Sequence, residues 1–399
     1  MLDSFKFNRM EIAGSLGDLG TLLPMAAGMI LINGLNPMGI FISIGLFYIL
    51  SGIYFGVTVS VQPMKVIGAY AIATAMTPQQ ILASGVLMAL FMFFIGATNL
   101  VTVIGKWVPK SVVRGIQLST GILLMAEGIK FMIGSSKFQI FKQLAEPYLV
   151  IQQVGFLPIG IIIGVLGGLV TLLLLENKRY PAGLIIILFG LAIGILLGTH
   201  ENYKDINISF FLPDFMPYGL PSKVDFVFAF FALALPQLPM TIGNAVIANA
   251  DLSKTYFGTK SKKVTYRSLS ISMSMANIIS FVLGGMPLCH GAGGLAAHYR
   301  FGARTAGSNL IIGGIFLVLA LILGKNILII VHLIPMSILG IMLLYAGSQL
   351  ALTILDLKER KALFVALTIL GITLASNLAF GFVVGIVLAK LLKGERFSI

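Results

Sequence analysis

The chain has 399 residues, of which 58% are hydrophobic and 10% are charged, with a formal net charge of +13 and a mean hydropathy of +1.01. A water-soluble protein of this size could not cover so much apolar surface, so the composition predicts a protein embedded in a lipid bilayer and excludes a soluble domain. The single cysteine excludes an internal disulfide and a thiolate cluster.

The chain opens with MLDSFKFNRMEIAGSLGDLG, which contains acidic residues and no small-residue cleavage site. We therefore expect the start of a first helix there and not a removable signal peptide. From that point, proline, glycine, asparagine and charged residues divide the apolar sequence into about fourteen segments. The segments are approximately 11–33, 37–57, 64–76, 79–104, 110–132, 156–175, 181–198, 224–250, 267–285, 290–301, 305–324, 333–353, 359–374 and 376–392. This pattern predicts an all-α polytopic membrane protein.

Two of the segments are too short to cross a bilayer. The segments at about 64–76 and 290–301 contain about twelve residues each, which as a helix span roughly 18 Å of a core that is about 30 Å thick. We expect both to be half-helices that end at mid-membrane.

Positive residues favour the cytoplasmic side of a membrane, and their distribution predicts the orientation. With both termini in the cytoplasm, six of the 27 lysines and arginines fall outside, Lys65 falls within the membrane, and the remaining twenty (27 − 6 − 1) fall on the cytoplasmic side. The six are Lys130, Lys137, Lys142, Lys204, Lys223 and Lys325. This asymmetry predicts a multi-pass protein of a plasma or inner membrane, and it explains the positive charge without nucleic acid.

Two motifs recur at nearly the same distance along the chain. The related pairs are Pro109 with Pro335, Ser111 with Ser337 and Gly121 with Gly347, each 226 apart, and Pro63 with Pro287, 224 apart. The offset predicts a duplication of seven helices, and because seven is odd, the second copy must be inverted. We expect a first repeat at 1–200, an extracytoplasmic connecting loop at 201–222 and a second repeat at 223–399, with the two half-helices meeting at mid-membrane.

The expected meeting point suits an anion. A half-helix directs unpaired backbone N–H groups and the positive end of its dipole into the membrane. Lys65 lies in the first turn of one half-helix, where an unneutralised charge costs about 2.5 to 3.5 kcal/mol on insertion scales, so we expect it to face a cavity or a partner. His290 and a run of glycines open the other, where missing side chains allow backbone amides to approach a ligand.

Four motifs, EIAGSLGDLGTLLP, VSVQPMKVIGA, ALPQLPMTIGNAVIA and MPLCHGAGGLAAHYRFGARTAG, resemble those of the molybdate transporter family, a branch of the sulfate permease (SulP) superfamily. The resemblance covers nearly all of the chain. It implies a core domain of helices 1–4 and 8–11, a gate domain of helices 5–7 and 12–14, and secondary active import of a tetrahedral oxyanion, molybdate first, with sulfate or tungstate as alternatives. The chain ends at Ile399, without room for the cytoplasmic regulatory domain of many sulfate permeases, which favours the molybdate branch.

The resemblance also implies a substrate site built from four places. Its residues are Asp18, Thr21, Gln62, Lys65, Gln237, Asn244, His290 and the backbone N–H groups of Gly291, Ala292 and Gly293. Asp18 is the exception in this set, because an ionised carboxylate repels an anion. We expect Asp18 either to pair with Lys65 in the empty state or to carry a symported proton.

Other functions stay open. A sulfate permease or a passive anion channel would use the same electrostatics, whereas a nucleobase permease would need acidic partners where Gln237, Asn244 and His290 stand. A membrane enzyme would need a nucleophile or a metal set, and Cys289 with His290 is too small a group of ligands for a metal site. We therefore expect no catalytic residue, metal or cofactor, and partners limited to the oxyanion, the bilayer and, as an open alternative, a second copy of the chain in a homodimer.

Overall fold

The computed structural model describes residues 5–98, 100–101, 108–174, 177, 180–200, 206 and 208–393. In the first half the helices are α1 (Arg9–Ser15), α2 (Leu19–Leu31), α3 (Pro37–Phe55), α4 (Lys65–Thr74), α5 (Pro78–Thr98), α7 (Lys110–Ile133), α8 (Lys137–Lys142), α9 (Ile159–Leu174) and α10 (Ala182–Leu197). In the second half they are α11 (Lys223–Ala229), η3 (Phe230–Ala234), α12 (Leu235–Met240), η4 (Thr241–Ala248), α13 (Asn249–Phe257), η5 (Gly258–Ser261), α14 (Tyr266–Val282), α15 (Ala292–Arg300), α16 (Gly307–Leu323), η6 (Gly324–Asn326), α17 (Ile327–His332), α18 (Met336–Ala351), η7 (Leu352–Asp356), α19 (Arg360–Ala375) and α20 (Leu378–Leu391).

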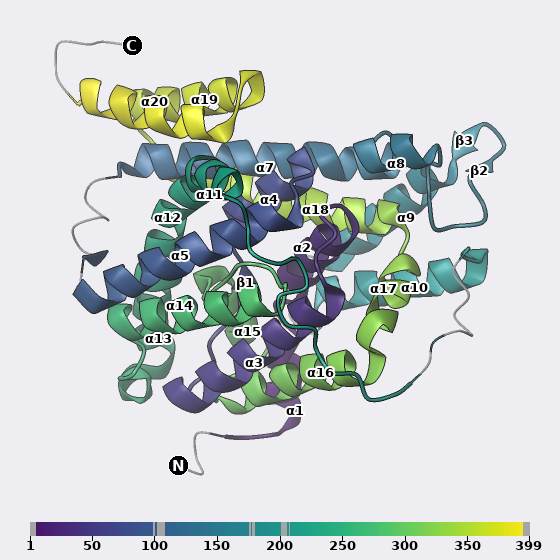
Figure 1. The fold of residues 1–399 in the computed structure, drawn as a ribbon, viewed down its shortest axis with the longest axis horizontal. Helices are drawn as coiled ribbons and strands as arrows, with labels where there is room; N and C mark the ends of the chain where they lie inside the picture. The colour runs from purple at the N-terminus through teal and green to yellow at the C-terminus, as the bar shows by residue number, and fades with distance from the viewer. Residues whose placement is uncertain are drawn as a thin grey trace.

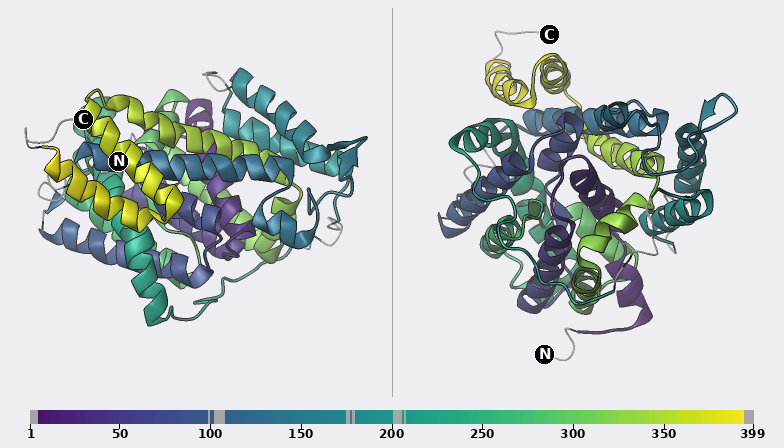
Figure 2. Two further views of the ribbon diagram at one scale, coloured as in Figure 1. Left: turned by 90° about the horizontal axis from the view of Figure 1, so that it is seen from above. Right: turned by 45° about the vertical axis from the view of Figure 1, so that its right-hand side comes forward.

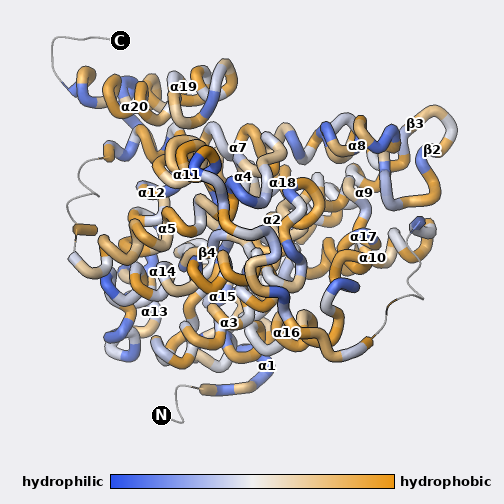
Figure 3. The backbone as a smooth tube through the Cα atoms, in the orientation of Figure 1, coloured by the Kyte–Doolittle hydropathy of each residue, from blue (hydrophilic) through white to orange (hydrophobic). Residues whose placement is uncertain are grey.

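The predicted membrane segments each coincide with a helix or a run of helices in the described residues, and the prediction of an all-α polytopic membrane protein is confirmed. Seven helices or helix runs there are at least 18 residues long and apolar enough to cross a bilayer. Large apolar side chains point outward from the peripheral helices, among them Leu173 of α9 and Leu196 of α10, which are 82% and 83% exposed. Figure 3 shows hydrophobic residues along most of these outer helices. Such a surface is stable only in contact with lipid.

The two short segments are confirmed as short helices. The helix α4 has 10 residues and α15 has 9, so neither spans a bilayer. The end of α4 is set by Ala75, which takes a left-handed conformation with φ of 53° and so stops the helix before Pro78.

The half-helices start from a common point. Each follows a two-residue strand, β1 (Gln62–Pro63) before α4 and β4 (Leu288–Cys289) before α15, and the two strands pair antiparallel. Gln62 lies opposite Cys289 and Pro63 opposite Leu288, and the ladder continues with a hydrogen bond of 2.9 Å from the Met64 amide to the Pro287 carbonyl. Pro63 and Pro287, which the 224-residue offset relates, lie on opposite strands in neighbouring pairs of this ladder. The twofold axis of an inverted repeat would pass between them.

A second contact has the same symmetry. The helices α7 and α18 pack against each other along their length, and Gly121 meets Gly347 where they cross. A Cβ on either glycine would lie 2.6 Å from the carbonyl oxygen of the other, so only glycine allows this approach. The offset of 226 relates these two glycines to each other. The contact of α3 with α16 and that of α5 with α14 are counterparts of each other, because the same offset relates α3 to α14 and α5 to α16.

The remaining helices surround this arrangement. Figure 1 shows α19 and α20 at one edge of the molecule, over α7, and α1 at the opposite edge, and the right-hand view in Figure 2 agrees. The residues at 208–222 run as an extended segment along α16 and α14, held by hydrogen bonds from Phe211 to Leu321 and from Met216 to Val282. Residues 201–205 and 207 of the predicted connecting loop, with Lys204, lie outside the described residues.

Candidate functional site

The first membrane segment is broken in the middle, and the break holds Asp18. The helix α1 ends at Ser15 and α2 begins at Leu19, so Asp18 lies at the start of α2, buried to 4% exposure. The Nε2 of Gln62 on β1 donates a hydrogen bond of 2.8 Å to the Oδ1 of Asp18. The other carboxylate oxygen is buried without a hydrogen-bond partner in the described residues, and it lies against Gly294 of α15. Thr21 interacts with this carboxylate from the first turn of α2.

The start of α4 is held by a side chain from the second repeat. Gln237 of α12 accepts hydrogen bonds through its Oε1 from the amides of Val66 and Ile67, at 2.9 and 3.2 Å. Its Nε2 donates to the hydroxyl of Thr241 at 2.9 Å. Gln237 therefore satisfies two of the four N–H groups that a helix leaves unpaired at its start.

The start of α15 has no such cap. Gly291 precedes the helix without a side-chain hydrogen bond, and within the described part of the chain the amides of Ala292 and Gly293 have no acceptor. The Nζ of Lys65 faces this end: a Cβ on Gly293 would lie 3.9 Å from it. Lys65 is half-buried and forms no ion pair within 4.0 Å among the described residues. An ammonium group and a helix N-terminus thus adjoin, and both favour negative charge.

Asp18 and Lys65 do not form the direct ion pair that we considered for the empty state. The carboxylate of Asp18 is hydrogen-bonded to Gln62 instead, and it interacts with Lys65 only at longer range.

His290 points away from this place. Its Nδ1 lies 2.7 Å from the Ser60 carbonyl oxygen and its Nε2 lies 2.9 Å from the hydroxyl of Ser272. Because a carbonyl only accepts, Nδ1 carries the proton and Nε2 accepts from the serine. The ring is fully buried between Phe47 and Phe55, with centroid distances of 4.4 and 5.7 Å. The side chain of His290 therefore fixes the start of α15, and the amides that follow are what faces Lys65.

Asn244 lies apart from the other predicted residues. It lines a cavity with Arg114 of α7, and none of the described residues that line this cavity belongs to the group around Asp18 and Lys65. The structure therefore brings together Asp18, Thr21, Gln62, Lys65 and Gly293. Gln237 is connected to this group through the amides of Val66 and Ile67 at the start of α4.

Two asparagines that the sequence analysis did not single out support the site. The side chain of Asn277 on α14 bonds both the amide and the carbonyl of Leu288, at 3.0 and 2.9 Å. Asn309 on α16 does the same for Val59, at 3.1 and 2.8 Å. Non-helical backbone at membrane depth must find partners inside the protein, and an asparagine amide matches both groups of a peptide. Their position within otherwise apolar segments is the signal that could have revealed them.

A cavity adjoins the site. It has a volume of about 350 Å³, and its lining includes Thr21, Gly293 in the first turn of α15 and Arg300 at the end of the same helix. Its walls come from α2 and α15 on one side and from α9, α10 and α18 on the other.

Comparison with known proteins identifies the family. The sequence profile described as "Molybdate transporter of MFS superfamily" matches residues 10–124 and 229–350. Molybdate transporter 2 of Arabidopsis thaliana is 31% identical over 96% of this chain and 87% of its own length. The chain belongs to the molybdate transporter family. Molybdate transporter 1 of Chlamydomonas reinhardtii is a more distant relative, 28% identical over 94% of this chain and 90% of its own.

Solved structures of anion transporters share the fold of this molybdate transporter family member. The transmembrane domain of the cyanobacterial bicarbonate transporter BicA matches with a TM-score of 0.67 and 17% identity over 97% of this chain and 98% of that one. SLC26A9 matches with a TM-score of 0.67 and 15% identity over 96% of this chain and 65% of its own. The profile description names the major facilitator superfamily, whereas the fold of this chain matches these two solved structures.

Proposed function

We propose that this protein imports a tetrahedral oxyanion, most favourably molybdate, by secondary active transport. The observation that carries the proposal is the uncapped start of α15 facing the unpaired ammonium of Lys65. A doubly charged oxyanion has several acceptor oxygens, and this place offers backbone amides and a cation that lack other partners. The relatives that are named as molybdate transporters support molybdate over sulfate or tungstate.

Alternating access is the mechanism that we propose. The cavity that includes Thr21 and Gly293 separates α2 and α15 from α9, α10 and α18, which lie in the segments predicted as core and gate respectively. Movement of the core against the gate would close this cavity and open the opposite side. With both termini in the cytoplasm, Arg300 lies on the cytoplasmic side, and the cavity is then the route by which the anion is released.

Asp18 is the proposed site of proton coupling. Its carboxylate is buried beside the anion position, with one oxygen free of hydrogen bonds in the described residues. A proton on that oxygen would remove a negative charge next to the substrate and would make the carboxyl a donor. The substrate and the proton would then favour each other's binding.

Uptake by purified protein in liposomes tests the proposal. Radiolabelled molybdate should enter, with competition by tungstate and sulfate, less by phosphate and none by uracil, and an inward proton gradient should accelerate the entry. Accumulation against the molybdate gradient distinguishes a coupled transporter from a passive channel. If no tetrahedral dianion is bound or transported, the proposal is wrong, and competition by uracil would favour a nucleobase permease.

A further inference from the structure

A second polar cavity lies between the eighth membrane segment and the fifth and twelfth. It has a volume of about 450 Å³, within the range of about 300 to 1,000 Å³ typical of small-molecule sites. Its polar lining residues are Lys110, Arg114 and Gln117 of α7, Asn244 of η4 and Thr353 of η7. None of the described residues that line it is acidic.

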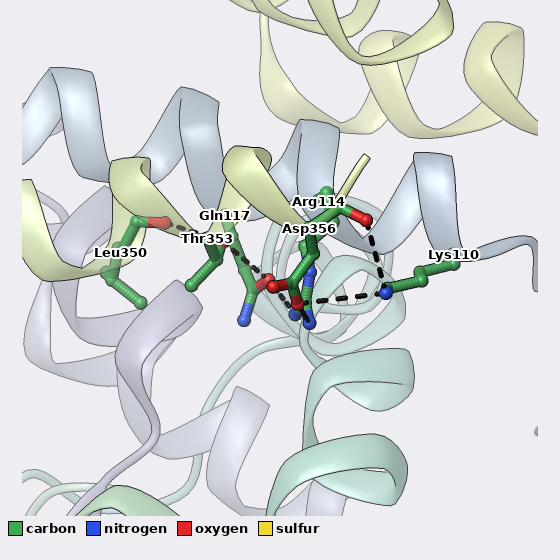
Figure 4. A network of polar contacts seen from close by, with 6 residues as sticks. All are labelled: Lys110, Arg114, Gln117, Leu350, Thr353 and Asp356. Atoms are coloured by element: carbon green, nitrogen blue, oxygen red, sulfur yellow. Dashed lines mark hydrogen bonds and ion pairs between the residues drawn. The ribbon is translucent and has the colours of Figure 1, made fainter. Parts of the chain in front are cut away.

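Ion pairs and hydrogen bonds hold the two cationic side chains of this cavity, Lys110 and Arg114, in place. Arg114 and Lys110 both pair with Asp356, the latter at 3.8 Å, and Arg114 also donates to the Oε1 of Gln117 at 2.8 Å (Figure 4). The hydroxyl of Thr353 donates to the same oxygen at 3.0 Å. Asp356 lines a neighbouring cavity and not this one. Two cations therefore share one carboxylate, and a net positive charge faces the cavity.

One donor in the cluster is also unused. The Nε of Arg114 is buried and has no hydrogen-bond partner in the described residues. A buried donor without an acceptor costs about 1 to 3 kcal/mol, so the guanidinium gains if a small movement brings Nε to a ligand oxygen. The amide of Asn244, on the opposite wall, can supply a further N–H group.

From these observations we propose a second oxyanion site, bounded by Lys110 and Arg114 on one wall and by Asn244 on the other. Its ligand is a small tetrahedral dianion, which shares its chemistry with both the transported anion and cellular sulfate or phosphate. The site is separate from the one at Lys65, because no residue of the group around Lys65 lines this cavity, and Thr21 and Gly293 of that group line a different one.

An anion in this cavity would touch two parts of the protein that are expected to move against each other. Asn244 belongs to the proposed core, and Arg114 and Thr353 belong to the proposed gate. A bound anion would bridge them and slow the movement, so a rising anion concentration on this side would restrain further import. This consequence rests on the proposed function, whereas binding at the site does not.

Equilibrium dialysis with radiolabelled molybdate, repeated with sulfate and phosphate, tests the proposal on purified protein. Wild type should bind two anions per chain. Lys65→Ala should remove one and Arg114→Gln the other, and Asn244→Ala should weaken the site that Arg114→Gln removes. Asp356→Asn should tighten that second site about tenfold or more, because a competing negative charge is lost and both cations remain. Lys358→Gln is the matched control and should change neither site. Lys358 lines the neighbouring cavity with Asp356 and does not line this one.

Each result has a definite meaning. One anion per wild-type chain, lost in Lys65→Ala and kept in Arg114→Gln, overturns the second site and leaves the proposed function intact. One anion that is lost in Arg114→Gln and kept in Lys65→Ala supports this site and overturns the function assigned to Lys65. If Arg114→Gln fails to fold, Asp356→Asn decides, and an unchanged affinity in that variant contradicts the proposal. Preference for phosphate or sulfate over molybdate at this site identifies a cellular anion as its ligand.

Discussion

The side-chain amide of Gln62 donates to one oxygen of Asp18 across 2.8 Å and leaves the other oxygen of that carboxylate buried and unbonded. The pair joins the break in the first membrane segment to the strand that precedes α4. It also places an acid beside the position proposed for an anion, which is unfavourable unless the acid can take up a proton.

Asp18→Asn should therefore remove the pH dependence of molybdate uptake. Asparagine keeps the shape of the side chain and an acceptor for Gln62, but it cannot ionise. We expect uptake that no longer responds to a proton gradient, measured in liposomes over a range of external pH. Glu127→Gln is the control, since Glu127 is another buried carboxylate outside the site. Its Oε2 lies 3.2 Å from the Nζ of Lys130. A wild-type rate and pH profile in Asp18→Asn would exclude proton transfer through this residue.

Lys65→Ala should weaken anion binding by about 2 kcal/mol or more, roughly 30-fold, because a partly buried ammonium next to a dianion gains several kcal/mol. Titration of the purified variant with molybdate measures the change. Lys130→Ala, which removes an exposed lysine at the far end of α7, should bind as wild type does. An unchanged affinity in a folded Lys65→Ala protein would remove Lys65 from the site.

Gly294→Ala should impair both folding and transport. The added Cβ would collide with the free oxygen of Asp18 and would lie 2.7 Å from the Cβ of Ser60 and 2.9 Å from the Nε2 of Gln62. We expect a destabilisation of about 1 to 3 kcal/mol from this overpacking, visible as a lower melting temperature in detergent. Gly314→Ala in α16, where a Cβ meets nothing within 4 Å, should be neutral or slightly stabilising. Equal melting temperatures for the two variants would contradict the packing described for α15.

His290→Ala should act on stability more than on affinity. The ring is packed between Phe47 and Phe55 and is hydrogen-bonded at both nitrogens, so its loss leaves a cavity and removes the donor to the buried Ser60 carbonyl, whereas Ser272 keeps its bond to Leu269. We expect a melting temperature several degrees lower, with a molybdate affinity in the folded fraction within about threefold of wild type. Ser272→Ala should show a smaller change in the same direction. A large loss of affinity in His290→Ala without loss of stability would instead make its ring a ligand.

Glu146 predicts a pH dependence of stability. It lies in the connection between α8 and β2 (Gln153–Val154), fully buried, and accepts hydrogen bonds from the amides of Met336 and Ser337 at the start of α18. Burial raises the pKa of this carboxyl from 4.5 to about 7. The folded state thus holds the proton more tightly than the unfolded chain does, so the stabilisation is complete below about pH 4.5 and is lost as the pH rises through about 7.

The comparison with Glu146→Gln measures this effect. The two proteins should melt at similar temperatures near pH 5, and wild type should lose stability relative to the variant toward pH 8, by about 3 kcal/mol at most. The exposed Glu359 provides the control, as Glu359→Gln should follow wild type at every pH. A constant difference between wild type and Glu146→Gln across the range would rule out titration of Glu146.

The sequence was sufficient for the architecture because the fold depends on patterns that are local or periodic. The length of each apolar run, the position of Pro63 and Pro287 and the constant offset between repeats indicated the half-helices and their common origin. The proximity of Lys65 to Gly293 followed from the same symmetry, since both lie in the first turn of a half-helix.

Side-chain direction could not be predicted in the same way. In an α-helix, Gln237 and Asn244 are seven residues and about two turns apart, so they would share a face. The prolines of ALPQLPM are accompanied by π-helical turns in η3 and η4, which are wider and shift the phase, and Asn244 lines a cavity with Arg114 instead. The orientation of His290 likewise depends on Phe47, Phe55 and Ser272, which come from distant segments.

The short ladder between β1 and β4 ties the origins of the two half-helices to each other through backbone hydrogen bonds. Neither helix start can shift without carrying the other, so the groups proposed to recognise the anion should move across the membrane as one rigid unit. Choice of anion and speed of transport then become separable properties. Substitutions at the two helix starts should change which anion is accepted. Substitutions where this unit packs against the surrounding helices should change how fast it moves.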